Sequence, residues 1–122
     1  MPMRIVAVLA AALVSGLVAA HHGGSMYERE SGLTIENAQV IAFFFVNPHA
    51  RLIFSRTNGD GDVEEWEGEL SGANELVRSG IYADLVEPGA RVTLTGRRHL
   101  SEPRNVRLSS IVLPDGRELQ LP

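Results

Sequence analysis

The sequence of 122 residues contains no cysteine and no lysine, and only 6% of its residues are aromatic. Without cysteine the chain forms neither a disulfide scaffold nor a thiolate zinc site, and it has no thiol nucleophile. The missing lysine excludes little, because arginine supplies all 11 basic residues against 15 acidic ones. This acidic balance disfavours nucleic acid and anionic membranes as partners. No serine elbow, phosphate-binding glycine loop or dinucleotide fingerprint occurs, so nothing positively indicates an enzyme.

The first 20 residues differ from the rest in composition, since 16 of them are apolar. Arg4 gives this segment a positive start, residues 5–14 are an unbroken apolar run, and Val18-Ala19-Ala20 supplies small residues for cleavage. The apolar stretch 5–20 is shorter than the roughly 20 residues that a membrane-spanning helix needs. We therefore predict a signal peptide at 1–20, a periplasmic or secreted protein, and no membrane attachment after cleavage.

The remaining chain predicts a flexible arm at 21–32, which is polar and contains two adjacent glycines, and one domain at 33–122. Runs rich in Val, Ile and Phe between turn residues predict strands in that domain. The first strand would extend about 46 Å at about 3.3 Å per residue, so it must bend or bulge. The predicted strands cover residues 33–46, 50–56, 63–70, 91–95 and 105–113, and a terminal ribbon strand covers 117–121.

Two local patterns separate these strands. The sequence Asn58-Gly59-Asp60-Gly61 is typical of a hairpin, because Asn and Gly tolerate positive φ. Residues 71–80 predict a short helix, with Ser71 as its cap, Leu76 and Val77 on its apolar side and Gly80 at a left-handed exit.

The order of these elements favours one all-β architecture with a single short helix. Three meander strands, a helix and two more strands are typical of a small OB-like five-stranded antiparallel barrel, here followed by a C-terminal ribbon. A six-stranded antiparallel sandwich with a helical plug fits the same pattern. A parallel α/β fold does not, because the crossover helices are missing.

Histidines provide the candidate site. If cleavage follows Ala20, the amine and ring of His21 can chelate one metal ion, and His22 or His49 can complete three nitrogen ligands. Nitrogen ligands in tetragonal geometry favour Cu(II), with Zn(II) as the alternative, and the thioether of Met26 suits Cu(I). Cleavage after Ala19 would instead place an imidazole at position three, which also binds Cu(II). The simpler interpretation is that two exposed histidines are polar arm residues.

The turn Asn47-Pro48-His49 also has two interpretations. Directly after a proline-fixed turn, His49 is placed to be rigid and partly exposed, as a ligand or a general base requires. Alternatively, Asn47 only satisfies turn amides and His49 only covers the strand edge.

Other polar patterns favour solvated structure over chemistry. The hairpin acids lack the glycine of a calcium loop. The glutamates at 65, 67 and 69 alternate on one strand face and are expected to face water, with Arg51 or Arg97 as cross-strand partners. The Arg97-Arg98-His99 cluster is either an anion site or a charged loop. The aromatic residues are expected in the core, with one Phe turned outward: Phe43, Phe44, Phe45, Trp66 and Tyr82.

Several motifs together resemble a family of small exported bacterial proteins of unknown function. They are His21-His22 after the leader, Asn47-Pro48-His49, Glu64-Glu65-Trp66, the segments 85–89 and 92–96, and Leu113-Pro114-Asp115-Gly116. The resemblance covers nearly the whole mature chain. It implies an exported small β-barrel and says nothing about catalysis. This chain departs from the family pattern at Gly23-Gly24 and at Val46.

The leading hypothesis is therefore an exported binding module with a copper or zinc site built from His21, His22 and His49. The alternative hypothesis is an interaction or assembly module for a protein or saccharide, without metal.

Overall fold

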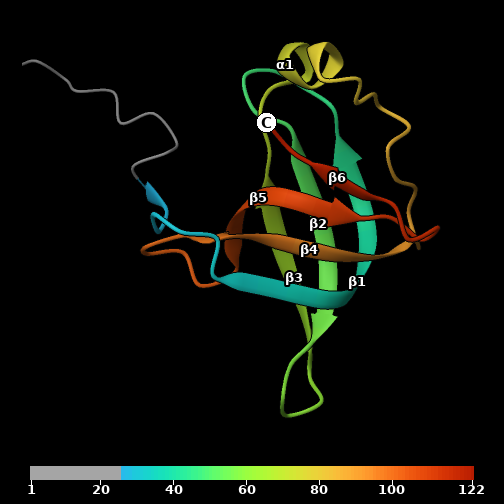
Figure 1. The fold of residues 1–122 in the computed structure, drawn as a ribbon. Helices are drawn as coiled ribbons and strands as arrows, with labels where there is room; N and C mark the ends of the chain where they lie inside the picture. The colour runs from blue at the N-terminus through green and yellow to red at the C-terminus, as the bar shows by residue number, and fades with distance from the viewer. Residues whose placement is uncertain (1–25) are drawn as a thin grey trace, which may run out of the picture.

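The structure is a computed structural model that describes residues 26–122 (Figure 1). The predicted leader, His21 and His22 lie outside these described residues. Six strands and one helix form the fold. The strands are β1 (Leu33–Phe44), β2 (Arg51–Thr57), β3 (Val63–Glu69), β4 (Arg91–Arg98), β5 (Asn105–Val112) and β6 (Glu118–Gln120), and the helix is α1 (Ala73–Arg78).

Five of the strands form a closed barrel. Neighbouring strands follow the order β3-β2-β1-β4-β5, and pairing of β3 with the start of β5 closes the ring. Strand β6 pairs antiparallel with the last residues of β5. The predicted OB-like barrel with a C-terminal ribbon is confirmed. The prediction that it is antiparallel throughout is wrong at one pair, because β3 and β5 are parallel. Strand directions can alternate around a closed ring only if the number of strands is even, and this ring has five.

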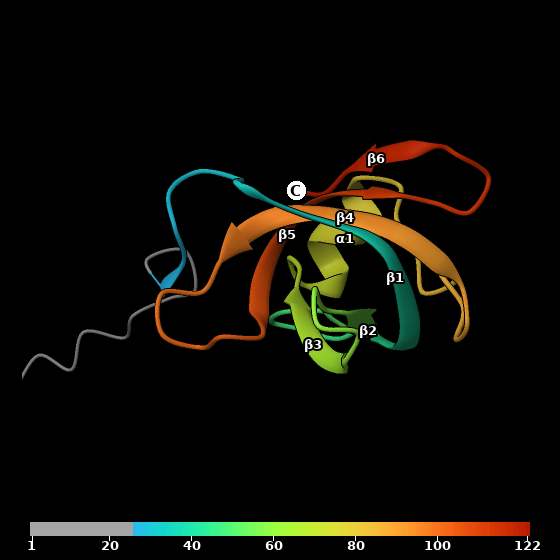
Figure 2. The same ribbon diagram turned by 90° about the horizontal axis from the view of Figure 1, so that it is seen from below.

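Strand β1 belongs to both halves of the barrel because it bends. Its register shifts between Ile35 and Ala38 against β4, and between Val40 and Ala42 against β2. Asn37 between the first pair has a φ of 55°, as a bulge residue often does. Figure 2 shows β1 and β4 arching over β2 and β3. The predicted bend is confirmed, although β1 ends at Phe44, before the predicted end.

The β2–β3 hairpin forms as predicted. Its register runs from Arg51 opposite Glu69 to Thr57 opposite Val63. In the turn, the side-chain oxygen of Asn58 accepts the backbone N–H groups of Asp60 and Asp62 at 2.9 and 3.0 Å. These hydrogen bonds explain the polar residues of the turn without a calcium ion.

Helix α1 is shorter than predicted, and its predicted cap is wrong. The N-cap residue is Gly72, which makes no side-chain cap, and Ser71 instead bonds to groups outside the helix. The side chain of Asn47 accepts the N–H of Asn74, so a residue from a distant loop does what Ser71 was expected to do. Gly80 has the predicted left-handed conformation, with a φ of 79°. The helix covers one end of the barrel, opposite the β2–β3 turn (Figure 1).

The core fills the barrel with side chains from every strand of the ring, and from α1. Phe54 is fully buried and stacks on the buried Trp66, with ring centroids 6.3 Å apart. Phe43 and Phe45 are half-buried, and Phe44 is the predicted outward aromatic. The expectation that Tyr82 is in the core is wrong, because this ring lies on the loop after α1 and is 55% exposed.

No helix among residues 26–122 is both long enough and apolar enough to cross a membrane.

Candidate functional site

The loop between β1 and β2 presents His49 with its two ring nitrogens in different surroundings. The side chain is 39% exposed, yet its Nδ1 atom is buried. Oε1 of Glu69 lies 2.7 Å from Nδ1, although the angle between them departs from that of a regular hydrogen bond. Since Nδ1 is covered, the exposed surface of the side chain belongs to its other atoms, which include Nε2.

Glu69 ends strand β3 and differs from the other outward glutamates. Its side chain is only 19% exposed, because Tyr27 donates a hydrogen bond of 2.6 Å to Oε2 and Arg107 lies 3.4 Å from Oε1. The expectation that the whole glutamate row faces water is therefore wrong at Glu69. It failed because the arm covers this end of the strand. Of the two predicted arginine partners, Arg51 lies 3.8 Å from Glu67.

Tyr27 brings the amino-terminal arm to this carboxylate. Its side chain is buried, and its hydroxyl oxygen lies 2.8 Å from the amide oxygen of Asn105 as well as 2.6 Å from Glu69. A phenol has one proton, and the charged carboxylate is the stronger acceptor. Burial, followed by the hydrogen bond to Glu69, raises the pKa of Tyr27 well above its usual value near 10. The hydroxyl therefore stays protonated and able to donate.

The backbone beside Tyr27 is also fastened to the barrel. The N–H of Glu28 donates to the carbonyl of Arg98, and the N–H of Leu100 donates to the carbonyl of Met26, both at 2.8 Å. The ring of Tyr27 meets His99 edge-on, with centroids 5.0 Å apart. The side chain of Met26 is 43% exposed beside this anchor. Residues 26–28 thus form a short bridge to the end of β4.

We call these side chains the Glu69 cluster: Tyr27, His49, Glu69, Asn105 and Arg107. It extends to the C-terminal segment, because Arg107 donates to Oγ of Ser71 at 3.0 Å, and Ser71 donates to the carbonyl of Pro122 at 2.6 Å.

A family of unknown function (DUF6152) matches residues 8–105 of the chain. The chain belongs to this family. The match confirms the predicted resemblance to a family of unknown function, and the matched range includes Tyr27, His49 and Glu69. No curated protein and no solved structure matches the chain.

In this family member, Asn47 and Pro48 position the loop that carries His49. Oδ1 of Asn47 accepts the N–H of Asn74 at 3.1 Å, and the carbonyl of Val46 accepts the N–H of Ala73 at 3.0 Å. Gly72 packs so closely that an added Cβ would lie 2.5 Å from the carbonyl oxygen of Pro48. The start of α1 therefore holds the loop, and Asn47 has a structural role whether or not it also contacts a ligand.

The two described histidines offer different chemistry. Nδ1 of His99 accepts backbone N–H groups from Ser101 and Glu102 at 3.1 and 2.9 Å, so this nitrogen is unprotonated and a neutral ring carries its proton on Nε2. His49 faces a carboxylate through Nδ1, which favours the proton there and leaves a lone pair on Nε2. Only His49 of these two presents a free lone pair at its exposed edge.

Residues 26–122 contain no group of three His, Asp or Glu side chains placed to hold a metal ion. His49 alone of the three predicted histidine ligands is described, so the predicted set lies partly outside the described residues. Sequence reasoning missed Glu69, Tyr27 and Arg107 as neighbours of His49.

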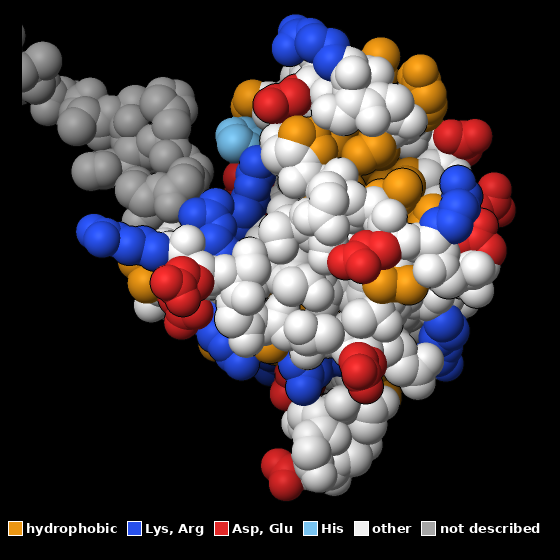
Figure 3. Space-filling model, viewed as in Figure 1, with side chains coloured by type: hydrophobic (Ala, Val, Ile, Leu, Met, Phe, Trp, Pro, Cys, Tyr) orange, Lys and Arg blue, Asp and Glu red, His pale blue; other side chains and the backbone are white. Residues whose placement is uncertain are grey.

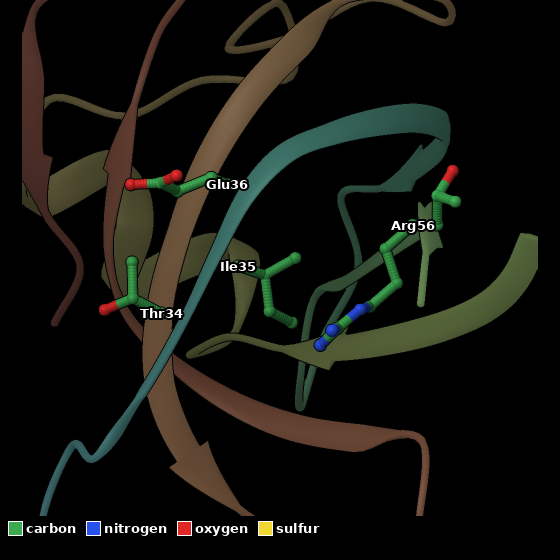
Figure 4. Close-up of a pocket in the computed structure, with 5 residues that line it drawn as sticks. Thr34, Ile35, Glu36 and Arg56 are labelled. Carbon is green, nitrogen blue, oxygen red and sulfur yellow. The ribbon is translucent and has the colours of Figure 1, made fainter. Parts of the chain in front are cut away.

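A separate hollow of about 300 Å³ lies at the end of the barrel near Thr34, Glu36 and Arg56. Figure 4 shows Thr34 and Glu36 pointing away from Arg56. The polar groups of this hollow do not converge, so it is a weaker candidate than the Glu69 cluster.

Proposed function

We propose that the protein is an exported metal-binding module, in which His21, His22 and His49 hold one Cu(II) or Zn(II) ion. The observation that supports this most directly is the carboxylate of Glu69 at the Nδ1 edge of His49. Histidines that bind metals usually direct their other ring nitrogen to a carboxylate or carbonyl, which fixes the tautomer and makes the ligating nitrogen more basic.

The position of the arm makes the site attainable. Tyr27 contacts the same carboxylate as His49, and His22 precedes Tyr27 by five residues, which span at most about 18 Å. The amine and ring of a terminal His21 would add two nitrogen ligands. A set of nitrogen ligands suits Cu(II) or Zn(II), and Met26 could add a thioether for Cu(I).

Export is part of the proposal, because the site depends on processing. Cleavage after Ala20 of the predicted leader would create the amine of His21. Recovery of the protein from the periplasm or medium, followed by amino-terminal sequencing, tests this step. Retention of residues 1–20 in the mature protein would contradict it.

Titration calorimetry of the processed protein with Cu(II) and Zn(II) tests the site itself. We expect one site tighter than micromolar, weakened by His49→Ala and by acetylation of the amino terminus. The control is Glu65→Gln, at an exposed carboxylate on the outward face of β3, which should bind like the wild type. Equal metal affinity in His49→Ala and the wild type would contradict the proposal.

A protein-interaction module is the second candidate function, and it is supported by a surface away from the Glu69 cluster. Among the described strands β6 pairs only with β5, which leaves its other edge open. Beside it, Tyr82, Leu85 and Leu119 line a hollow of about 210 Å³, and Figure 3 shows hydrophobic side chains gathered between α1 and β6. An extended segment of a partner could add to such an edge. Metal-free protein from the periplasm would favour this candidate.

A further inference from the structure

We infer that Glu69 and Tyr27 form a positioning pair that couples docking of the amino-terminal arm to the state of the His49 ring. The metal-binding consequence of this inference rests on the proposed function. The coupling itself is a property of the metal-free protein and can be tested there.

The two oxygens of the Glu69 carboxylate contact different residues. Oε1 of Glu69 lies 2.7 Å from Nδ1 of His49, and Oε2 accepts the hydroxyl proton of Tyr27 at 2.6 Å. The 2.6 Å distance from Tyr27 lies in the range of hydrogen bonds from a hydroxyl to a charged oxygen, which are stronger than those between neutral groups. Rotation of the carboxylate would therefore disturb the ring of His49 and the anchor of the arm together.

The surrounding strands restrict that rotation. Glu69 lies directly opposite Arg107 in the parallel pair of β3 and β5, and the Nη1 atom of Arg107 is 3.4 Å from Oε1. The other arginine opposite Glu69 is Arg51 on β2, and its guanidinium is instead 3.8 Å from Glu67. Arg107 itself donates a hydrogen bond of 3.0 Å to Oγ of Ser71. The carboxylate is thus held in place before any ligand arrives.

Two consequences follow for the arm and the ring. With the proton of His49 on Nδ1, the lone pair on Nε2 is available at the exposed edge of the ring. His21 and His22 precede the docked Tyr27 by only six and five residues, a separation that would raise their effective concentration at His49. Coupling between arm docking and metal binding is reciprocal, so a bound metal ion would also stabilise the docked arm.

The ring of His49 gives the first test, by nitrogen NMR of the metal-free protein. We expect the wild type to show the Nδ1–H tautomer and Glu69→Gln to shift the mixture toward Nε2–H. The matched control is Glu67→Gln, on the same outward face of β3 two residues earlier, which should leave the tautomer unchanged. An unchanged tautomer in Glu69→Gln would overturn the inference.

The arm gives the second test, by hydrogen exchange at the amides of Glu28 and Leu100, which bond to Arg98 and Met26. Tyr27→Phe and Glu69→Gln should each speed exchange at both amides roughly tenfold, as expected for loss of a hydrogen bond to a charged group. Tyr82→Phe, at an exposed tyrosine, is the control. Unchanged exchange in both variants overturns the coupling. If Tyr27→Phe fails to fold, Glu69→Gln against Glu67→Gln still decides the matter, because these changes remove charge without removing volume.

Metal titration separates this inference from the proposed function. We expect Glu69→Gln and Tyr27→Phe to bind Cu(II) 10- to 100-fold more weakly than the wild type, as is usual when the partner of a metal-binding histidine is lost. If the wild type binds no metal, the proposed function fails, and the tautomer and exchange measurements still decide the inference. If Glu69→Gln binds as tightly as the wild type, the inference fails while the proposed function stands.

Discussion

Tyr27 is a residue whose ionisation is linked to folding. Its pKa is raised because the ring is buried and because its hydroxyl donates to the Glu69 carboxylate, so the folded protein favours the neutral phenol. In the unfolded chain the phenol has a pKa near 10. The neutral Tyr27 hydroxyl therefore stabilises the folded protein fully below about pH 10. This stabilisation is lost as the pH rises toward the raised pKa of Tyr27 in the folded state.

Denaturant unfolding of the wild type and Tyr27→Phe across alkaline pH tests this linkage. Above about pH 10, the free energy of unfolding of the wild type should fall by up to about 1.4 kcal/mol per pH unit more than that of Tyr27→Phe. Below that pH, the difference between the two proteins should be constant. A difference that stays constant to pH 11.5, roughly 1.5 pH units above the ordinary pKa, contradicts the linkage.

The candidate site was only partly predictable at the scale of residues. The proline before His49 indicated a rigid and partly exposed ring, and the ring has that exposure. The contact between His49 and Glu69 could have been predicted from the hairpin. Counting paired residues back from the Asn58 turn places Glu69 opposite Arg51, and therefore diagonal to His49. Tyr27 and Arg107 could not be found this way, since their contacts depend on arm docking and barrel closure over long sequence separations.

At the scale of elements, α1 depends on the loop before β2. A helix of six residues cannot form alone in water, and Asn47 satisfies one of its free amides from 27 residues away. The sequence predicted the presence of the helix and its glycine exit. It could not predict the cap, because Ser71 and Asn47 are both good capping residues and tertiary structure decides between them.

Asn47→Ala should therefore destabilise the protein by about 1 kcal/mol, the usual cost of losing a helix cap. Asn47→Asp is the matched control, because its carboxylate can still accept the N–H of Asn74 and suits a helix N-terminus. Denaturant midpoints of the three proteins provide the measurement. If Asn47→Asp loses as much stability as Asn47→Ala, the capping role is wrong.

Gly72 sets how closely this loop and α1 approach. An added Cβ would lie 2.5 Å from the Pro48 oxygen and 2.7 Å from Oδ1 of Asn47. Neither the backbone of Pro48 nor the capping side chain of Asn47 can move away without a cost in free energy. We expect Gly72→Ala to cost about 1–3 kcal/mol, as overpacking does, and to shift the NMR signals of His49. Gly59→Ala, where an added Cβ meets nothing within 4 Å, is the control. Similar losses in both variants would contradict the steric argument.

At the scale of the whole molecule, the order of elements predicted the barrel. Three meander strands, a helix and two further strands leave few ways to bury Ile35, Phe54 and Leu94 together. The length of the first strand predicted its bend, while the bulge positions depend on pairing with two partners at once. The parallel closure could have been predicted too, because five strands cannot alternate around a ring.

The barrel interior should dominate stability. Phe54→Ala is expected to cost about 3–5 kcal/mol, because Phe54 is fully buried against Trp66. Phe44→Ala removes the same side chain where it is 43% exposed and stacked near Arg51, so it should cost less than about 1.5 kcal/mol. Thermal and denaturant unfolding measure both. Comparable losses would mean that the core is not where the structure places it.

The meeting of the arm, the β1–β2 loop and the last residues at one cluster has a practical consequence for labelling. Tyr27 contacts Glu69, and the carbonyl of Pro122 accepts a hydrogen bond from Ser71, so a tag fused at either side of residues 26–122 adjoins the same atoms. The β2–β3 turn lies at the opposite end of the barrel (Figure 1), and Gly59 has open space around it. A fluorophore or an affinity peptide inserted in this turn would label the protein without contacting the Glu69 cluster.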